Sequence, residues 1–287
     1  NGSGNSALAN ITTSTAFGLN ITYSGTGVLT LAGTASNWNS GLVTVSAGTL
    51  RLGASEVIPD GAGKGNLTRG PALGVTATFD LRGFSETING LTATSAGNAV
   101  IDNTSATPVT LTIGAADAAV TVGGGGGTFT VANTGAGAVS LVKTGAASVT
   151  LPAAGTTLNH RGATSVTGGT LVVAAPLAAT TALSSTGVGS NLSITGGISA
   201  PSGVATFTVG GGAILSLLDG FGTPLTALTS LNLGAGAGTA TIGLELGTAS
   251  DLLAVSTPAV VANTVRFNLN GISGLADITT YNLVTAP

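Results

Sequence analysis

The chain has 287 residues, which is enough for one or two ordinary domains with a buried core. Only 6% of the residues are charged, against roughly 25% in typical soluble proteins. The formal net charge of -3 gives no electrostatic basis for binding nucleic acid or an anionic membrane, and the absence of cysteine excludes disulfides, thiolate metal sites and thiol catalysis.

Alternating apolar and polar residues run through almost the whole chain, which is the pattern of short β-strands. Gly, Asn or Ser-Gly turns separate these stretches, and no unbroken run of ~18 apolar residues could span a bilayer. Residues 213–218 and 225–231 have helical spacing but are too short to form a helix alone. We predict an all-β chain with strands at 28–31, 42–45, 49–52, 109–113, 120–122, 128–131 and 139–142, and continuing alternation at 244–255, 265–271 and 280–284.

Two stretches of the chain align with each other, which indicates an internal repeat. Residues 25–52 and 143–173 each contain a hydrophobic strand, a polar bend, a Thr/Val strand and a Gly-Thr-Leu strand. Leu29 aligns with Val149, and Leu50 aligns with Leu171. A single unit of this kind cannot bury its apolar face, but stacked copies share one core, so we expect a solenoid.

The two copies resemble the autotransporter-associated β-strand repeat, also called the passenger-associated transport repeat. That repeat has roughly the pattern G-x-L-x-L-x-G, an Asn-rich bend, G-x-T-x-V and a closing G-T-L. The Gly-Thr-Leu ends at 48–50 and 169–171 match its close, and residues 79–91 look like the Leu/Asn/Gly/Phe rung that often follows it. The resemblance covers roughly residues 20–175.

This resemblance implies a right-handed parallel β-helix, or β-solenoid, on a large bacterial protein that is secreted or displayed on the cell surface. We expect a solenoid over residues 1–175, and over residues 176–287 either further rungs, which we favour, or a small β-sandwich. About 20 residues per rung and ~4.8 Å between rungs would give fourteen or so rungs and a rod of roughly 65 Å. Because the first residue is Asn1 rather than Met, we expect the chain to be part of a longer protein.

Three functional hypotheses follow from the resemblance and the composition. The leading hypothesis is a non-enzymatic structural or adhesive segment on the bacterial surface, whose weakly charged copies stack head to tail into a filament. A second is a passenger stalk that holds a functional tip away from the cell. A third, from another class, is a secreted β-helix enzyme that acts on polysaccharide.

His160 is the single histidine of the chain. Without a second histidine or any cysteine, it can form neither a metal cluster nor a Cys/His pair. The Gly-x-Ser-x-Gly elbow of many serine hydrolases is also absent. We therefore expect His160 to lie in a bend beside Arg161.

Acidic residues are spread singly along the sequence, whereas β-helix lyases and glycosidases need acids clustered on neighbouring rungs. The densest group is Asp80 with Arg82 and Glu86, for which we expect an exposed ion pair. We predict no catalytic, cofactor-binding or metal site. The ten acids are Glu56, Asp60, Asp80, Glu86, Asp102, Asp117, Asp219, Glu245, Asp251 and Asp277.

Three further features have structural interpretations that we favour. The five glycines at 123–127 lack the Lys and Ser/Thr of a phosphate loop and predict a turn. Trp38 lies in a bend, where it either caps the rung below or contacts carbohydrate. The Thr-x-Thr segments at 76–78, 110–112 and 128–130 do not recur at a fixed rung spacing, which disfavours an ice-binding surface.

Overall fold

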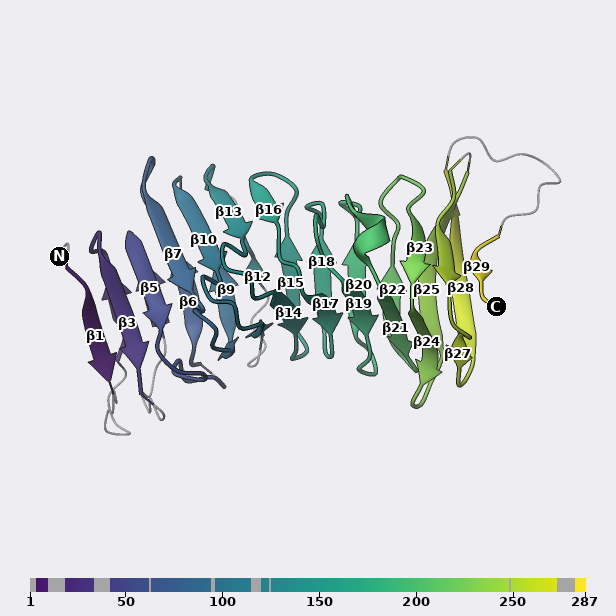
Figure 1. The fold of residues 1–287 in the computed structure, drawn as a ribbon, viewed down its shortest axis with the longest axis horizontal. Helices are drawn as coiled ribbons and strands as arrows, with labels where there is room; N and C mark the ends of the chain where they lie inside the picture. The colour runs from purple at the N-terminus through teal and green to yellow at the C-terminus, as the bar shows by residue number, and fades with distance from the viewer. Residues whose placement is uncertain are drawn as a thin grey trace.

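The chain, in a computed structural model, is an all-β parallel solenoid of about ten turns (Figure 1). Its strands stack along the long axis, from β1 near the N-terminus to β28 near the other end. The one helical element of the described part is a 3-10 turn, η1 (Pro201–Gly203). The structure describes residues 4–9, 19–33, 42–61, 63–93, 96–114, 120–123, 125–247, 249–272 and 282–287.

Three long parallel sheets run along the described part of the solenoid. The first sheet contains β1 (Ser6–Ala9), β3 (Val28–Ala32), β5 (Gly48–Leu52), β7 (Thr76–Asp80), β10 (Asn98–Asp102), β13 (Thr128–Val131) and β16 (Thr156–Leu158). The second contains β8 (Glu86–Ile88), β11 (Val109–Ile113), β14 (Val139–Lys143), β17 (Ala163–Val166), β19 (Ala182–Ser185), β21 (Thr206–Gly210), β24 (Ser230–Ala235) and β27 (Val260–Val261). The third contains β12 (Val120–Thr121), β15 (Ser148–Leu151), β18 (Thr170–Val173), β20 (Asn191–Ile194), β22 (Ile214–Ser216), β25 (Ala240–Leu246) and β28 (Val265–Gly271).

Two shorter sheets lie at the ends of the solenoid. The fourth sheet, in the N-terminal part, contains β2 (Ile21–Tyr23), β4 (Leu42–Val45), β6 (Asn66–Arg69) and β9 (Gly90–Thr92). The fifth sheet, in the C-terminal part, contains β23 (Pro224–Leu228), β26 (Leu252–Val255) and β29 (Val284–Thr285).

The core consists of inward-facing residues that stack on one another from rung to rung. In the first sheet one such column runs through Leu50, Phe79, Ile101, Val131 and Leu158, all of them buried. Each buried side chain of this size contributes roughly 1.5–3 kcal/mol of hydrophobic stabilisation. The alternate residues of the same strands point outward, which explains the two-residue period in the sequence.

The expected β-helix is confirmed, but the expected number of rungs is wrong. Paired residues on adjacent rungs lie 19 positions apart at Ala163 and Ala182 and 30 positions apart at Asn98 and Thr128. In the longer rungs, the extra residues lie in the corners between sheets. The chain therefore makes about ten turns rather than fourteen.

The two aligned repeats have the same local structure on different sheets. Leu29 pairs with Leu50 in the first sheet, and Val149 pairs with Leu171 in the third. Each copy thus spans one full turn of the solenoid, from one strand to the strand stacked on it, with β4 in between in the first copy and β16 and β17 in the second. Because the copies lie on different sheets, the distance between them in the sequence is not a whole number of turns.

The rungs continue beyond residue 176. Strands β19, β20, β21, β22, β24, β25, β27 and β28 pair in parallel with earlier strands of the second and third sheets, and β26 pairs with β23 in the fifth. The two segments with helical spacing contribute β22 and β23 instead of helices.

Candidate functional site

A connected group of polar side chains lies at a corner where strands of the first sheet end. Here β7, β10 and β13 of the first sheet end and the chain turns toward β8, β11 and β14 of the second, whereas β5, which carries Arg51, is followed by β6 of the fourth sheet. We call the side chains that connect successive rungs at this point the corner ladder, and they are Arg51, Asp80, Asp102, Asn103, Thr104, Asn133 and Thr134.

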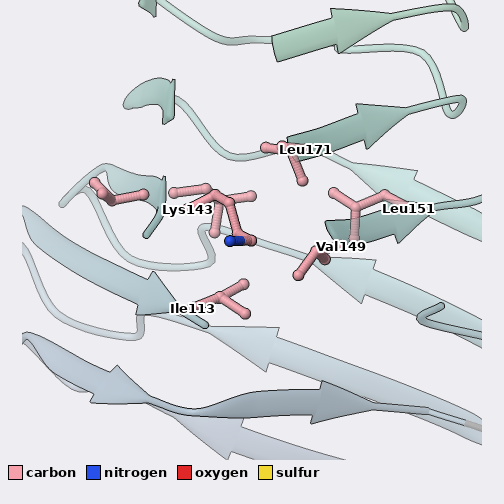
Figure 2. A pocket seen from close by; sticks show the side chains of 7 residues that line it. Ile113, Lys143, Val149, Leu151 and Leu171 are labelled. Carbon is pink, nitrogen blue, oxygen red and sulfur yellow. The ribbon is translucent and has the colours of Figure 1, made fainter. Parts of the chain in front are cut away.

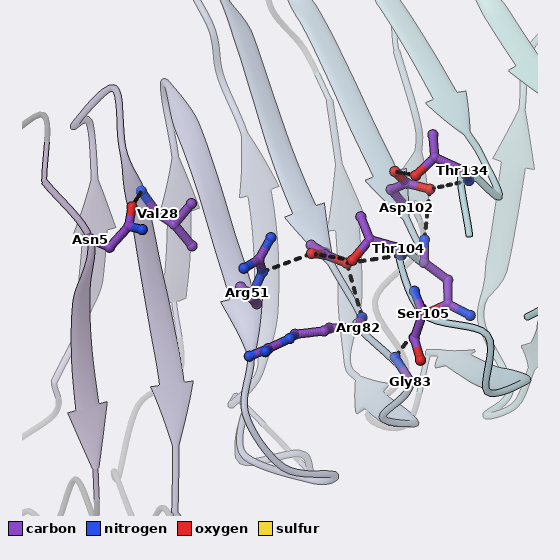
Figure 3. Close-up of polar contacts among 11 residues, drawn as sticks. Asn5, Val28, Arg51, Arg82, Gly83, Asp102, Thr104, Ser105 and Thr134 are labelled. Atoms are coloured by element: carbon purple, nitrogen blue, oxygen red, sulfur yellow. Dashed lines mark hydrogen bonds and ion pairs between the residues drawn. The ribbon is translucent and has the colours of Figure 1, made fainter. Parts of the chain in front are cut away.

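Asp80 is the buried centre of the corner ladder, and Figure 3 labels its partners Arg51 and Thr104. Its Oδ2 accepts a hydrogen bond from Nε of Arg51 on the preceding rung, at 2.9 Å. On the following rung, the Thr104 hydroxyl donates to the carboxylate at 2.9 and 3.0 Å, and the Thr104 N–H donates at 3.2 Å. One carboxylate therefore ties three consecutive rungs together.

Asp102 repeats this arrangement one rung further along. Its Oδ1 accepts the backbone N–H of Asn103 at 2.8 Å and that of Thr134 at 2.9 Å, and its Oδ2 accepts the Thr134 hydroxyl (Figure 3). Asp80 and Asp102 occupy paired positions in β7 and β10. An aspartate at the end of a strand thus binds a threonine at the next corner, 24 residues on in one case and 32 in the other.

Asn103 completes the ladder with all of its amide atoms in use. Its Nδ2 donates to the carbonyls of Thr107 and Gly137 at 2.8 and 3.0 Å. Its Oδ1 accepts the N–H groups of Gly83 and Ser105 at 2.9 and 3.2 Å. Since these polar atoms already have partners, the ladder is arranged to hold the corner in place rather than to bind or activate a substrate.

The expectation of an exposed ion pair at Asp80, Arg82 and Glu86 is wrong. Asp80 is buried and pairs with Arg51, while Arg82 contributes only its backbone N–H, at 3.0 Å. Glu86 is also buried, and its two oxygens accept the N–H groups of Val57 and Ile58 at 3.0 and 3.1 Å. Burial raises the pKa of Glu86 to about 8 against the opposing effect of these two hydrogen bonds.

Acids that are separated in the sequence also meet in the C-terminal rungs. Oδ1 of Asp251 accepts the Thr223 N–H and its Oδ2 accepts the Glu245 N–H, both at 2.7 Å. Burial raises the pKa of Asp251 to about 6, with Asp219 and Glu245 adding to the effect. The three acids are therefore not spread singly in space, but no group of acids and histidines in the described residues could hold a metal ion.

His160 lies in the predicted bend, between β16 and β17, but its imidazole is fully buried. Its Nε2 lies 2.8 Å from the Thr164 hydroxyl, which lies 3.1 Å from the Thr180 hydroxyl. Burial lowers the pKa of His160 to about 4, so the ring is neutral at physiological pH. No carboxylate is bonded to it within the described residues, and the geometry is that of a core histidine.

Two hollows of the described part differ in size and lining. One internal cavity of about 10 Å³ lies among Ile113, Leu141, Val149 and Leu171, beside the stem of Lys143 (Figure 2). It is barely large enough for one water molecule. The Lys143 ammonium donates to the carbonyls of Thr144, Gly145 and Gly168.

The glycine-rich turn lines a surface hollow of about 270 Å³. The hollow is formed by Gly126 and Gly127 together with Ala154 and Gly155 from the next rung. It presents backbone groups and one methyl group. Gly124 lies outside the described residues, as do Trp38, Asp117, Asp277 and Tyr281.

Small uncharged side chains cover the outer face of the second sheet. One column of paired residues runs through Thr112, Val142, Ser165, Ser184, Thr208 and Asn232, and a second through Thr110, Ser140, Ala163, Ala182, Thr206 and Ser230. The hydroxyl of Ser184 donates to that of Ser165 at 2.8 Å. The other two Thr-x-Thr segments lie on the first sheet, where Asn98 and Val100 separate them.

Comparison of the chain with protein-family models, with curated proteins and with solved structures finds no match. The described residues include no helix with the length and apolar character needed to cross a bilayer. What the structure itself establishes is a parallel β-solenoid with repeats.

Proposed function

We propose that this chain is a non-enzymatic structural segment of a bacterial surface or secreted protein, a stiff rod that stacks with further copies of itself. The observation that carries the proposal is the unbroken parallel pairing of the second and third sheets, from β8 to β27 and from β12 to β28. Such a rod is held by backbone hydrogen bonds and by one continuous core, and neighbouring rungs support one another along its length.

The sequence supports the surface location. The Gly-Thr-Leu repeats resemble those of autotransporter passengers, which are carried outside the cell. A charge content of 6% leaves little on the surface for salt or pH to alter. A passenger stalk would use the same rod to hold another domain away from the cell.

The last described rung supports end-to-end stacking. Phe267 and Leu269 of β28 pair with Ile242 and Leu244 of β25, which are fully buried. They therefore face inward like the core residues below them, yet 36% and 49% of their surface remains exposed. A further rung laid on β28 would cover these side chains and satisfy the free edge of the strand.

The first described rung has a matching feature. Leu8 of β1 pairs with Leu31, which is buried, and Leu8 itself is 39% exposed. A second copy that placed its β1 end on the β28 end of the first would bury apolar side chains from both. Because the two surfaces differ, this contact repeats without closing and gives an open fibre.

Sedimentation velocity over a range of concentrations tests the stacking. We expect the wild-type chain to form progressively larger species, and Phe267→Asp with Leu269→Asp to remain monomeric, because a buried carboxylate would oppose the contact. Asn268→Asp is the matched control, since it adds a charge to the outward face of the same strand and should leave assembly intact. A wild-type chain that stays monomeric at every concentration would contradict self-stacking.

A further inference from the structure

Arg69 is one of the largest fully buried side chains of the described structure. It ends β6 on the same inward face as Leu67. Its Nη1 donates to the Val100 carbonyl at 3.1 Å, and its guanidinium carbon lies 5.0 Å from the centre of the Phe129 ring. Since Val100 and Phe129 belong to the first sheet and Arg69 to the fourth, the side chain crosses the interior of the solenoid.

The charge of this guanidinium is uncompensated by the residues that the structure describes. The ion pair of the described residues joins Arg51 to Asp80 and does not include Arg69. Burial lowers the pKa of Arg69 only to about 9, so the group is still cationic at neutral pH. A buried cation without a counter-charge is strongly unfavourable.

Two donors on one edge of the guanidinium lack a partner among the described residues, and they are Nε and Nη2. The N–H bonds of these two nitrogens run parallel in the plane of the group. This is the edge with which arginine binds oxyanions and other anions side-on. The guanidinium lies over the Phe129 ring, and the Val100 carbonyl accepts a hydrogen bond from Nη1. The edge formed by Nε and Nη2 is therefore the part of the group without a hydrogen-bond partner among the described residues.

Small residues precede Phe129 in its inward column. Gly48, Ala77 and Ala99 occupy the paired positions on the three preceding rungs of the first sheet. Where the neighbouring column has Leu50, Phe79 and Ile101, these positions have at most a methyl group. The short side chains at these positions accommodate the long side chain of Arg69 in the interior.

We propose that Arg69 binds a small inorganic anion of the size of chloride inside the solenoid, through Nε and Nη2. Such an anion would accept hydrogen bonds from both unpartnered donors and neutralise the charge. A water molecule would satisfy a donor but would leave the charge uncompensated. The site is enclosed, so the anion would enter as the rungs close during folding. This inference is independent of the proposed function.

Thermal unfolding at constant ionic strength provides the first test. We expect chloride or bromide, compared with the bulky anion gluconate, to raise the unfolding temperature of the wild-type chain saturably by roughly 2–4 °C. Arg69→Met, which removes the charge and keeps the length of the side chain, should abolish this halide dependence. Arg266→Met is the matched control on the exposed face of β28 and should retain it.

Anomalous diffraction from wild-type crystals grown in bromide provides a second test that does not require a folded variant. We expect a bromide peak within hydrogen-bond distance of Nε and Nη2 of Arg69. The proposal is overturned if this position holds a water molecule or nothing, if the wild-type chain shows no preference for halide, or if Arg69→Met keeps that preference.

Discussion

Several of the few ionisable side chains of this chain are buried. Arg69, Asp80, Glu86, Lys143 and Asp251 are all buried, and each except Arg69 has its charged atoms in hydrogen bonds with the chain. These groups join one rung to the next or close a corner. These buried ionisable groups therefore stabilise the contacts between rungs and at the corners.

Asp80→Ala tests the corner ladder. The substitution leaves Arg51 and the Thr104 donors without their shared acceptor, and we expect the free energy of unfolding to fall by roughly 2–4 kcal/mol. Chemical denaturation measures this loss. Asp60→Ala, at an exposed position, is the control and should change stability by less than about 0.5 kcal/mol. Equal effects of the two substitutions would argue against a structural ladder.

Glu86 should make the solenoid less stable as the pH rises. Its pKa is about 8 in the folded chain against 4.5 as the ordinary value, so its protonated form is favoured by folding. The stabilisation is fully present below pH 4.5 and is lost as the pH rises through 8. Denaturation curves between these limits should show a loss on the order of 5 kcal/mol that is absent in Glu86→Gln. The same pH slope in the variant would refute this origin.

His160 should have the opposite effect. Its pKa is about 4 in the folded chain against 6.5 as the ordinary value, so folding favours the neutral ring. The corresponding stability is present above pH 6.5 and is lost as the pH falls toward 4. We expect His160→Gln to be less sensitive to acid over this range, and NMR titration of the imidazole gives its pKa directly. A histidine that titrates near 6.5 in the folded chain would contradict the burial of the ring.

At the scale of the element, backbone geometry explains why the Gly-Thr-Leu strand of each copy begins with glycine. Gly48 and Gly169 begin the Gly-Thr-Leu strands of the two copies, and both have a φ of +63°. A Cβ at Gly48 would collide with the carbonyl oxygens of Gly25 and Gly27, and one at Gly169 with those of Gly145 and Ala147. The glycine is therefore required both by the backbone angle and by the turn of the preceding rung.

Gly48→Ala separates these two requirements when it is compared with Gly189→Ala. Gly189 also has a positive φ, +77°, but open space surrounds its Cβ position. We expect Gly189→Ala to cost roughly 1–2 kcal/mol for the backbone angle alone, and Gly48→Ala to cost clearly more because the backbone below must move. Urea unfolding of both variants measures the difference. Equal costs would show that the close approach at Gly48 contributes nothing.

Strand positions were predictable from the sequence because alternation and turn residues act locally. The predicted ranges for β4, β11, β13 and β28 agree with the structure at both ends. The inward position of Arg69 also follows from its two-residue spacing to Leu67, because alternate residues of a strand share one face. The pairing of Asp80 with Arg51 could not be read in this way, because 29 residues separate them.

At the scale of the whole molecule, the number of turns depends on the lengths of the corners between sheets, and strand patterns in the sequence do not determine those lengths. Rungs of 19 to 31 residues have no single period, so a fixed rung length of about 20 residues predicts too many turns. The corner ladder does have a weak signature in the Asn-Thr pairs at 103–104 and 133–134, each of which follows a strand of the first sheet. Its meaning appears only when the rungs are stacked.

Cryo-electron microscopy of the purified chain at increasing concentration is the most direct test of a self-stacking rod. About ten turns at ~4.8 Å per rung give a particle roughly 48 Å long. We predict that longer rods appear in multiples of this length, with the rung spacing unbroken across each junction. Particles that keep the single length at every concentration, or that associate only side by side, would contradict it.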